Sequence, residues 1–139
     1  MTELKQKLET SLAECPIIGI FRGVRPHEVI EIGEAACKAG LRVMEVPLNS
    51  PNPFESIYKL RSHFGDRMIV GGGTVLTAED ARALAGAGGQ ICVSPNCDPL
   101  VIEAAIETQI IPIPGIATPT EAFAAVKAGV EFLKLFPAS

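Results

Sequence analysis

The sequence predicts an α/β fold of the (β/α)8 type, the TIM barrel, and three observations predict it. Apolar runs of strand length alternate with helical segments along the whole chain. These runs are almost uniformly apolar, as expected when a parallel sheet is covered on its outer face. A unit also recurs, because residues 36–45 and 125–134 both pass from a helix end through Lys-Ala-Gly into a strand. Lys-Ala-Gly as a simple helix stop would explain the shared glycine, but not the matched charged residues Glu45 and Lys134.

The predicted elements follow one another without a linker, so we expect residues 1–139 to form one domain. The predicted strands are 17–21, 42–46, 68–71, 91–94, 110–113 and 132–136. The predicted helices are an N-terminal segment, 26–39, 53–64, 78–87, 99–108 and 119–128.

Local sequence signals support the helix boundaries. Four prolines stand where a first helical residue is expected, where the missing N–H costs nothing: Pro26, Pro53, Pro99 and Pro119. The predicted N-caps are Asn52, Asp98, Thr118 and Thr77, and Glu121 completes a capping box with Thr118. Glycines at 40, 65, 88 and 129 are expected to end helices.

The number of strands is smaller than a whole barrel requires. A (β/α)8 barrel has eight strands and commonly about 250 residues, whereas this chain supplies a leading helix and about six βα units in 139 residues. We therefore expect the first three-quarters of a barrel, truncated after the sixth strand and poorly stable alone. An open doubly wound sheet is the rival, but six strands without a phosphate-loop fingerprint give it little support.

Composition excludes several classes of protein. The hydrophobic fraction of 47% suffices for one core, and the net charge of −4 comes from interspersed charges. Neither nucleic-acid binding nor a membrane span or signal peptide is expected. The four cysteines form no CxxC pair, which favours a reduced cytoplasmic protein. The two histidines, His27 and His63, are too scattered for a zinc site, so we expect neither a metal nor a cofactor.

The predicted site lies where the strands end, because barrel active sites form at the carboxyl ends of the strands. Lys134 shares a strand face with Phe132 and Phe136, in a strand that we expect to be buried. Burial would lower the pKa of this lysine and leave a nucleophilic amine suited to Schiff-base formation. A lysine that reaches solvent at a strand end, or pairs with a carboxylate, is the alternative.

Three further strand ends supply complementary groups. Glu45, on the second predicted strand, can share an interior layer with Lys134 and shuttle protons, unless the two form a structural ion pair. Arg22 suits a substrate carboxylate, with a surface salt bridge as the alternative. The glycine-rich segment Gly72-Gly73-Thr74 offers N–H groups and a hydroxyl for an anion, or serves only as a tight turn.

Together these motifs resemble the aldolases that cleave 2-keto-3-deoxy-6-phospho sugar acids. The matching segments cover the chain in order: GIFRGV (19–24), EVPLNSPNPFESI (45–57), GGGTVLTAED (71–80), VSPN (93–96), IPGIATPTEAF (113–123) and LKLFPAS (133–139). The resemblance implies a class I pyruvate aldolase, an aldehyde-lyase of carbohydrate metabolism, usually a homotrimer. It implies that Lys134 forms the imine with pyruvate and that Glu45 is the general acid and base. It further implies that Arg22 and Thr74 hold the pyruvyl carboxylate, and that Pro95 and Phe136 pack against the pyruvyl unit.

The segment 47–50 separates two branches of this resemblance. Phosphogluconate enzymes often carry Thr-Leu-Arg-Thr there, whereas this chain has Pro-Leu-Asn-Ser, which is similar to the phosphogalactonate branch. We therefore expect 2-dehydro-3-deoxy-6-phosphogalactonate as substrate, with the phosphogluconate epimer as the alternative. The family's phosphate site lies on the last two strands of the barrel, so no residue here is assigned to it. A metal-dependent aldolase and a partial barrel that only binds ligand are the remaining alternatives.

Overall fold

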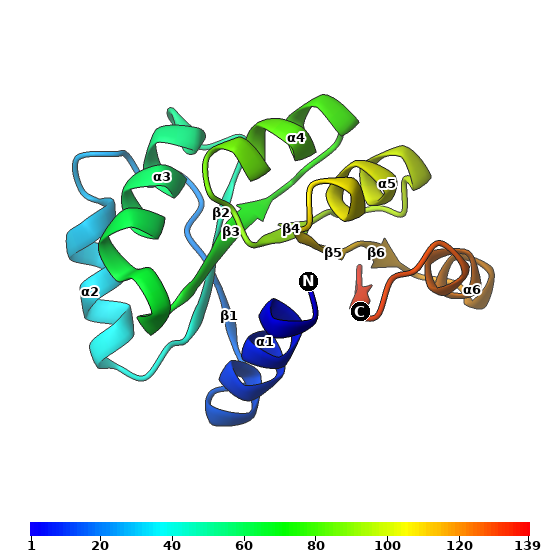
Figure 1. Ribbon diagram of the computed structural model, residues 1–139, viewed down its shortest axis with the longest axis horizontal. Coiled ribbons are helices and arrows are strands. Elements are labelled where there is room, and N and C mark those ends of the chain that lie inside the picture. Colours follow the sequence, from blue (N-terminus) through cyan, green and yellow to red (C-terminus); the bar gives the residue numbers. More distant parts are fainter.

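The computed structural model describes residues 1–139, in which a parallel sheet carries a row of helices (Figure 1). Five strands pair in the order of the sequence: β1 (Ile18–Ile20), β2 (Val43–Pro47), β3 (Ile69–Gly73), β4 (Ile91–Val93) and β5 (Ile111–Ile113). One residue, Pro114, separates β5 from β6 (Gly115–Ile116), which pairs in parallel with β7 (Lys134–Leu135). The sequential order is that of part of a (β/α)8 barrel, and it excludes the doubly wound rival, in which the strand order reverses.

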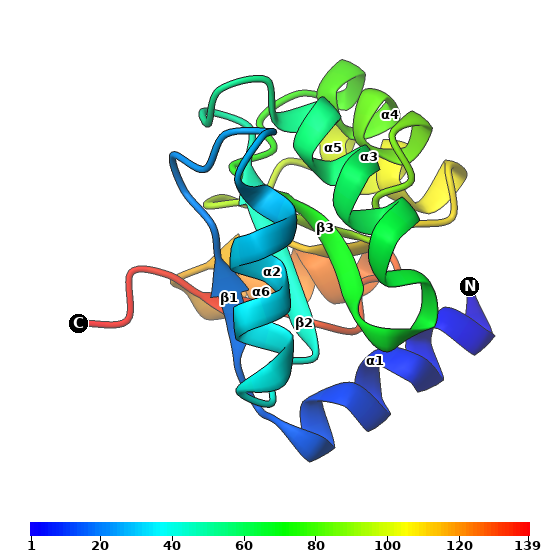
Figure 2. The same ribbon diagram turned by 90° about the vertical axis from the view of Figure 1, so that its left-hand side faces the viewer.

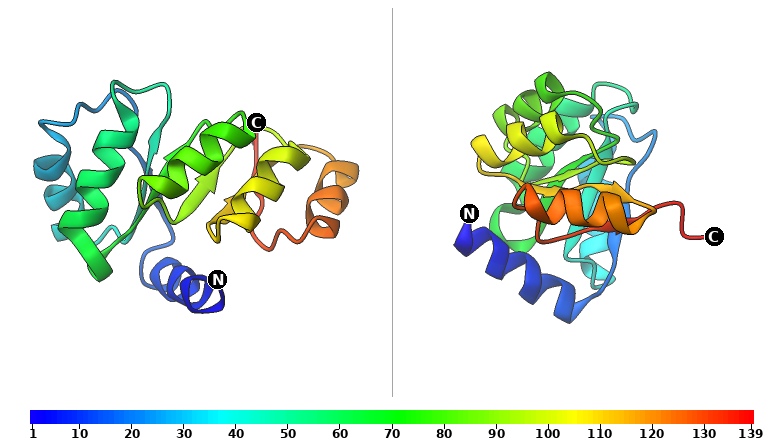
Figure 3. Two further views of the ribbon diagram at one scale, coloured as in Figure 1. Left: turned by 45° about the horizontal axis from the view of Figure 1, so that its top comes forward. Right: turned by 90° about the vertical axis from the view of Figure 1, so that its right-hand side faces the viewer.

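The helices form two groups. Five of them connect successive strands: α2 (Val29–Lys38), α3 (Pro53–Phe64), α4 (Ala78–Gly86), α5 (Pro99–Glu107) and α6 (Pro119–Lys127). The first, α1 (Thr2–Glu14), lies apart from these (Figures 2 and 3). A 3-10 turn, η1 (Gly65–Arg67), follows α3. No helix has both the length and the apolar character that crossing a membrane requires.

Apolar side chains cover both faces of the sheet. On the inner face, Val43, Ile69 and Ile91 pack around Leu8 of α1. On the outer face, Met44 and Val70 pack against the helices that connect the strands. Neighbouring residues of one strand therefore belong to different layers, as expected for strands buried on both sides. This alternation places Glu45 on the inner face, as predicted.

Most of the predicted helix boundaries are confirmed. Pro53, Pro99 and Pro119 are first helical residues. The backbone N–H of Leu100 donates to Asp98, and that of Glu121 donates to Thr118. The same arrangement holds at Thr77, whose hydroxyl accepts from the backbone N–H of Asp80.

One predicted helix boundary is wrong, and one predicted N-cap makes no capping hydrogen bond. The second predicted helix begins at Val29 and not at Pro26, because the backbone N–H of Arg25 donates to the Glu28 carboxylate and closes a turn before the helix. Asn52 precedes α3, but its backbone is left-handed, with φ of 43°, and its side chain makes no capping hydrogen bond.

The last strand is less buried than predicted. Leu135 is 62% exposed and Phe136 is 45% exposed. Because β7 pairs only with the two residues of β6, its other edge has no strand partner.

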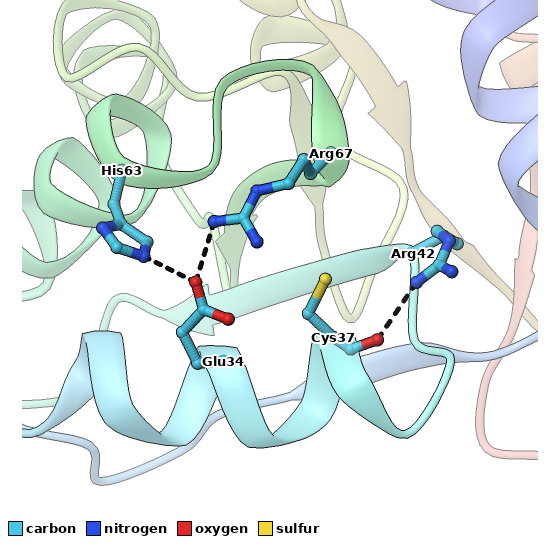
Figure 4. Close-up of polar contacts among 5 residues, drawn as sticks. All are labelled: Glu34, Cys37, Arg42, His63 and Arg67. Atoms are coloured by element: carbon cyan, nitrogen blue, oxygen red, sulfur yellow. Dashed lines mark hydrogen bonds and ion pairs between the residues drawn. The ribbon is translucent and has the colours of Figure 1, made fainter.

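A polar cluster joins the middle of α2 to the C-terminal end of α3 and to η1 (Figure 4). Glu34 of α2 accepts hydrogen bonds from Arg67 Nη2 at 2.8 Å and from His63 Nε2 at 2.7 Å. Both donors lower the pKa of Glu34, which is about 2, and Arg67 has the larger effect. Nearby, Arg42 Nη1 donates to the carbonyl oxygen of Cys37 at 3.2 Å. The cluster is partly exposed and contacts no predicted site residue, so its role is to join the two helices.

Candidate active site

A pocket of about 200 Å³ lies at the carboxyl ends of the strands. Its lining consists of Ile20, Arg22, Glu45, Thr74, Pro95, Lys134 and Phe136. All of these except Ile20 were predicted as site residues. They come from segments up to 114 positions apart, from Arg22 to Phe136. A second cavity, of about 240 Å³, lies near α1 and α6. Its charged lining residues, Lys5 and Glu131, form an ion pair with each other, and no predicted site residue reaches it.

Glu45 is the most enclosed ionisable group of the pocket. It lies in β2 with 3% of its surface exposed, and its Oε2 atom has no hydrogen-bond partner. Burial raises the pKa of Glu45 to about 7, although the charges of Lys134 and Arg22 act in the opposite direction. A carboxyl group with this pKa is part protonated at neutral pH, so it can both accept and donate a proton there.

The glycines beside Glu45 do not line the pocket. A Cβ atom on Gly73 would collide with the carboxyl group of Glu45, so glycine at 73 makes room for that side chain. Gly72 faces the other side of the sheet, where a Cβ atom would lie 2.9 Å from Leu84 of α4. Because alternate residues of a strand face opposite ways, only one of the two can face the interior. The structure therefore does not bring Gly72 to the pocket and places Gly73 beneath the carboxyl group.

Arg22 is oriented by neutral oxygen atoms. Its Nη2 donates to Thr74 Oγ1 at 3.1 Å, and its Nε lies 3.4 Å from Asn49 Oδ1. Thr74 has a left-handed backbone with φ of 53°, which is unusual for a β-branched residue. Arg22 forms no ion pair, so the alternative role of Arg22 in a surface salt bridge is excluded. Its positive charge faces the pocket and is not engaged in an ion pair with a protein carboxylate.

Lys134 faces the same pocket from β7. Its Nζ lies 4.4 Å from the centre of the Phe136 ring, a cation–π distance. Its backbone N–H donates to the Pro114 carbonyl at 2.9 Å, which fixes the strand. Lys134 is half-buried, so the prediction of a buried strand around this lysine is wrong, because β7 pairs with β6 alone. No ion pair joins Lys134 to Glu45, so the structural ion pair is not formed either.

Sequence reasoning missed Asn49, Ser50 and Ile20. Ser50 is 5% exposed, and its Oγ accepts a hydrogen bond from the backbone N–H of Gly23 at 3.0 Å. The available signal was the polar Asn-Ser pair at the carboxyl end of β2, where the sequence marked a branch difference but no site residue.

No group of three or more His, Cys, Asp or Glu side chains is arranged to hold a metal ion.

A sequential parallel sheet with ionisable groups at its carboxyl edge defines an α/β-barrel protein with a site in the usual position for this fold. A profile of the family described as "KDPG and KHG aldolase" matches residues 8–139. The chain belongs to the KDPG and KHG aldolase family.

Two relatives within this family are similar to the chain along most of its length. The chain is 44% identical over 126 residues to a probable 2-dehydro-3-deoxy-6-phosphogalactonate aldolase of Rhizobium meliloti (strain 1021), covering 91% of this chain and 59% of the relative. It is 43% identical over 124 residues to the 2-dehydro-3-deoxy-6-phosphogalactonate aldolase of Escherichia coli (strain K12), covering 89% and 60%. The chain thus spans about 60% of the length of these relatives.

Solved structures agree in fold. A structure described as native KDPGal superposes with a TM-score of 0.87 at 42% identity, covering 91% of this chain and 61% of that one. The KDPG aldolase of Legionella pneumophila, with pyruvate captured as a covalent carbinolamine intermediate, gives a TM-score of 0.84 at 27% identity, covering 92% and 62%.

Proposed function

We propose that the protein is a class I aldolase that cleaves 2-dehydro-3-deoxy-6-phosphogalactonate to pyruvate and D-glyceraldehyde 3-phosphate. The observation that carries the proposal is the convergence of Lys134, Glu45 and Arg22 on one pocket of about 200 Å³. Such a pocket holds an amine, a carboxyl group with a pKa of about 7 and a guanidinium that forms no ion pair. The names of the two relatives at 43–44% identity support both the reaction and the choice of epimer.

Binding comes first in the proposed mechanism. The carboxylate of the keto acid pairs with Arg22, whose side chain is oriented by Thr74. Pro95 and Phe136 supply apolar contact to the rest of the pyruvyl unit. This arrangement places the C2 carbonyl carbon near the amine of Lys134.

Covalent chemistry follows at C2. The neutral amine of Lys134 attacks the carbonyl carbon, and the carbinolamine loses water to give an imine. Glu45 donates and accepts the protons of these steps, and its carboxylate form then takes the proton of the C4 hydroxyl. The C3–C4 bond breaks and its electron pair enters the imine in its protonated form, which becomes a neutral enamine as glyceraldehyde 3-phosphate leaves. Protonation at C3 and hydrolysis release pyruvate and restore Lys134.

Borohydride trapping tests the chemistry directly. The purified protein is incubated with pyruvate and sodium borohydride, and the intact mass and peptide map are recorded. We expect a reduced pyruvyl adduct on Lys134 and no adduct on Lys134→Arg, which keeps the charge but cannot form the imine. Lys127→Arg, on the exposed end of α6, is the matched control and should label normally. Pyruvate binding without an adduct would instead support the alternative of a barrel that only binds ligand.

The choice of epimer is tested by comparing the two substrates. The protein is offered the phosphogalactonate and phosphogluconate substrates, and kcat/KM is measured for each. We expect the ratio to favour the galactonate epimer, and a preference for the gluconate epimer would establish the alternative substrate. We also propose a cytoplasmic homotrimer, which sedimentation velocity and fractionation of the source cells test independently.

A further inference from the structure

We propose that Ser50, assisted by Asn49, is a positioning residue for Arg22, and that the loop after β2 thereby sets the affinity of the pocket for the carboxylate of its substrate. The inference rests on the proposed function and concerns residues outside the pocket lining. Ser50 is buried, with 5% of its surface exposed, and its Oγ accepts a hydrogen bond from the backbone N–H of Gly23, the residue that follows Arg22.

The backbone of Arg22 is held on both sides. The N–H of Phe21 donates to the Glu45 carbonyl at 2.9 Å, and the N–H of Gly23 donates to Ser50 Oγ at 3.0 Å. Both acceptors belong to β2 or the loop that follows it. Gly23 has φ of 82°, a region open mainly to glycine, so the chain turns sharply directly after Arg22. The Ser50 hydroxyl accepts a hydrogen bond from the backbone of this turn, and a mutation can remove that bond.

The loop that carries Ser50 is itself anchored. The N–H of Leu48 donates to the Gly73 carbonyl, and the N–H of Ser50 donates to the Pro47 carbonyl, each at 2.9 Å. One end of the loop is therefore tied to β3, next to Thr74, and the other end to the turn after Arg22. Thr74 is also the residue that accepts from the guanidinium of Arg22. The loop thus fixes the positions of Arg22 and Thr74 relative to each other.

The partners of Arg22 are electrically neutral. A carboxylate at position 49 or 74 would orient the guanidinium equally well, but it would also compete with the substrate for its charge. Asn49 and Thr74 orient Arg22 and leave that charge free. The 3.4 Å separation between Asn49 Oδ1 and Arg22 Nε is long for a hydrogen bond, so we assign Asn49 the smaller share.

The test separates carboxylate binding from imine formation. Borohydride trapping on Lys134 is measured against the concentration of pyruvate and, separately, of methyl pyruvate, which lacks the carboxylate charge. Ser50→Ala should raise the half-saturating concentration of pyruvate by about five- to tenfold, the value of one hydrogen bond. Half-saturation by methyl pyruvate should change by less than about twofold. Ser50→Thr, which keeps the hydroxyl, should restore pyruvate binding.

Two further variants exclude a general structural effect. In an Arg22→Ala background, Ser50→Ala should add nothing, because a residue that acts through Arg22 has no effect without it. Asn49→Ala should raise the half-saturating concentration of pyruvate about two- to threefold. Because the side chain of Asn49 is exposed, this variant should fold, and it tests the proposal if Ser50→Ala does not fold. Asn52→Gly is the matched control, since Asn52 makes no capping hydrogen bond and its left-handed backbone suits glycine.

The outcomes divide cleanly. Equal shifts for both ligands, or an effect of Ser50→Ala that persists without Arg22, would overturn the positioning role while leaving the aldolase proposal intact. Absence of any adduct on the unmutated protein would refute the proposed function itself, and the positioning role would fall with it.

Discussion

Glu45 shows how one buried side chain links the chemistry of the pocket to the stability of the fold. Its pKa in the folded chain is about 7, against an ordinary value of 4.5. Between these two pH values the folded state binds more protons than the unfolded state, so the free energy of unfolding falls as the pH rises. Burial is the main cause of the raised pKa, and burial ends when the chain unfolds.

Glu45→Gln should therefore become more stable relative to the parent protein as the pH rises. The difference in free energy of unfolding should be small near pH 5 and approach about 3 kcal/mol above pH 7.5, by conversion of the pKa difference. Urea unfolding of both proteins from pH 5 to pH 8 measures it. Two curves that stay parallel over this range would show that the pKa of Glu45 is not raised.

The same substitution should slow turnover by about 10² to 10⁴, the usual contribution of a general acid or base. The pyruvyl adduct on Lys134 should still form at saturating pyruvate, although more slowly. In the parent protein, kcat/KM should change with an apparent pKa near 7, and Glu45→Gln should lose that inflection. Unchanged turnover in Glu45→Gln would remove the residue from the mechanism.

Residue type and residue environment differ in how far they could be predicted. The position of Glu45 on the inner face followed from strand alternation. The conformation of Thr74 did not, because a β-branched residue avoids a left-handed backbone unless its surroundings impose one. The contact between Ser50 and Gly23 was equally hidden, since 27 positions separate the two residues.

At the scale of elements, α2 and α3 make a close contact at Gly33. A Cβ atom on Gly33 would lie 2.8 Å from Phe64 Cε2 and 3.0 Å from Leu60 Cδ2, both on α3. Because Phe64 and Leu60 are fully or almost fully buried, they have little space into which to move.

Gly33→Ala should therefore destabilise the protein by about 1 to 2 kcal/mol, since crowding exceeds the gain of about 1 kcal/mol that alanine brings to a helix. Gly86→Ala is the matched control in α4, where a Cβ atom meets nothing within 4 Å, and it should be neutral or stabilising. Chemical denaturation measures both. A Gly33→Ala protein as stable as Gly86→Ala would show that α2 can shift without cost.

Helix boundaries show where local signals suffice. Asp98 and Thr118 cap α5 and α6 as predicted, because a cap depends on residues within three positions of it. At Pro26 a competing local contact, from the Arg25 N–H to Glu28, delays the helix. The exposure of β7 could not be read from its apolar sequence, because burial depends on which strands pair with it.

At the scale of the molecule, α1 closes the interior of the sheet on the side away from the other helices. Leu8 is fully buried and belongs to one apolar cluster with inner residues of β2, β3, β4 and β5. These residues include Val43, Ile69, Ile91 and Ile111. The N-terminal helix thus belongs to the core of the sheet.

Leu8→Ala should lower the free energy of unfolding by about 2 to 5 kcal/mol, the range for leucine in a core. Leu100→Ala is the matched control, because Leu100 is 64% exposed and should lose less than about 0.5 kcal/mol. Denaturant midpoints of the two variants give the comparison. Equal losses would mean that α1 is only loosely attached.

The sequence by itself determined the alternation of strands and helices, the order of the elements, most helix caps and the chemistry gathered at the strand ends. These features depend on periodicity and on neighbours a few positions away, which a single chain displays directly. The tertiary structure alone decided that Glu45 is enclosed while Lys134 is only half-buried. It also decided that Gly72 faces away from the pocket, that Gly73 makes room for a carboxyl group, and that Ser50 holds the turn after Arg22. The physical reason is that burial, pKa and orientation are set by the distant segments that fold against a residue, and their approach has no local signature in the sequence.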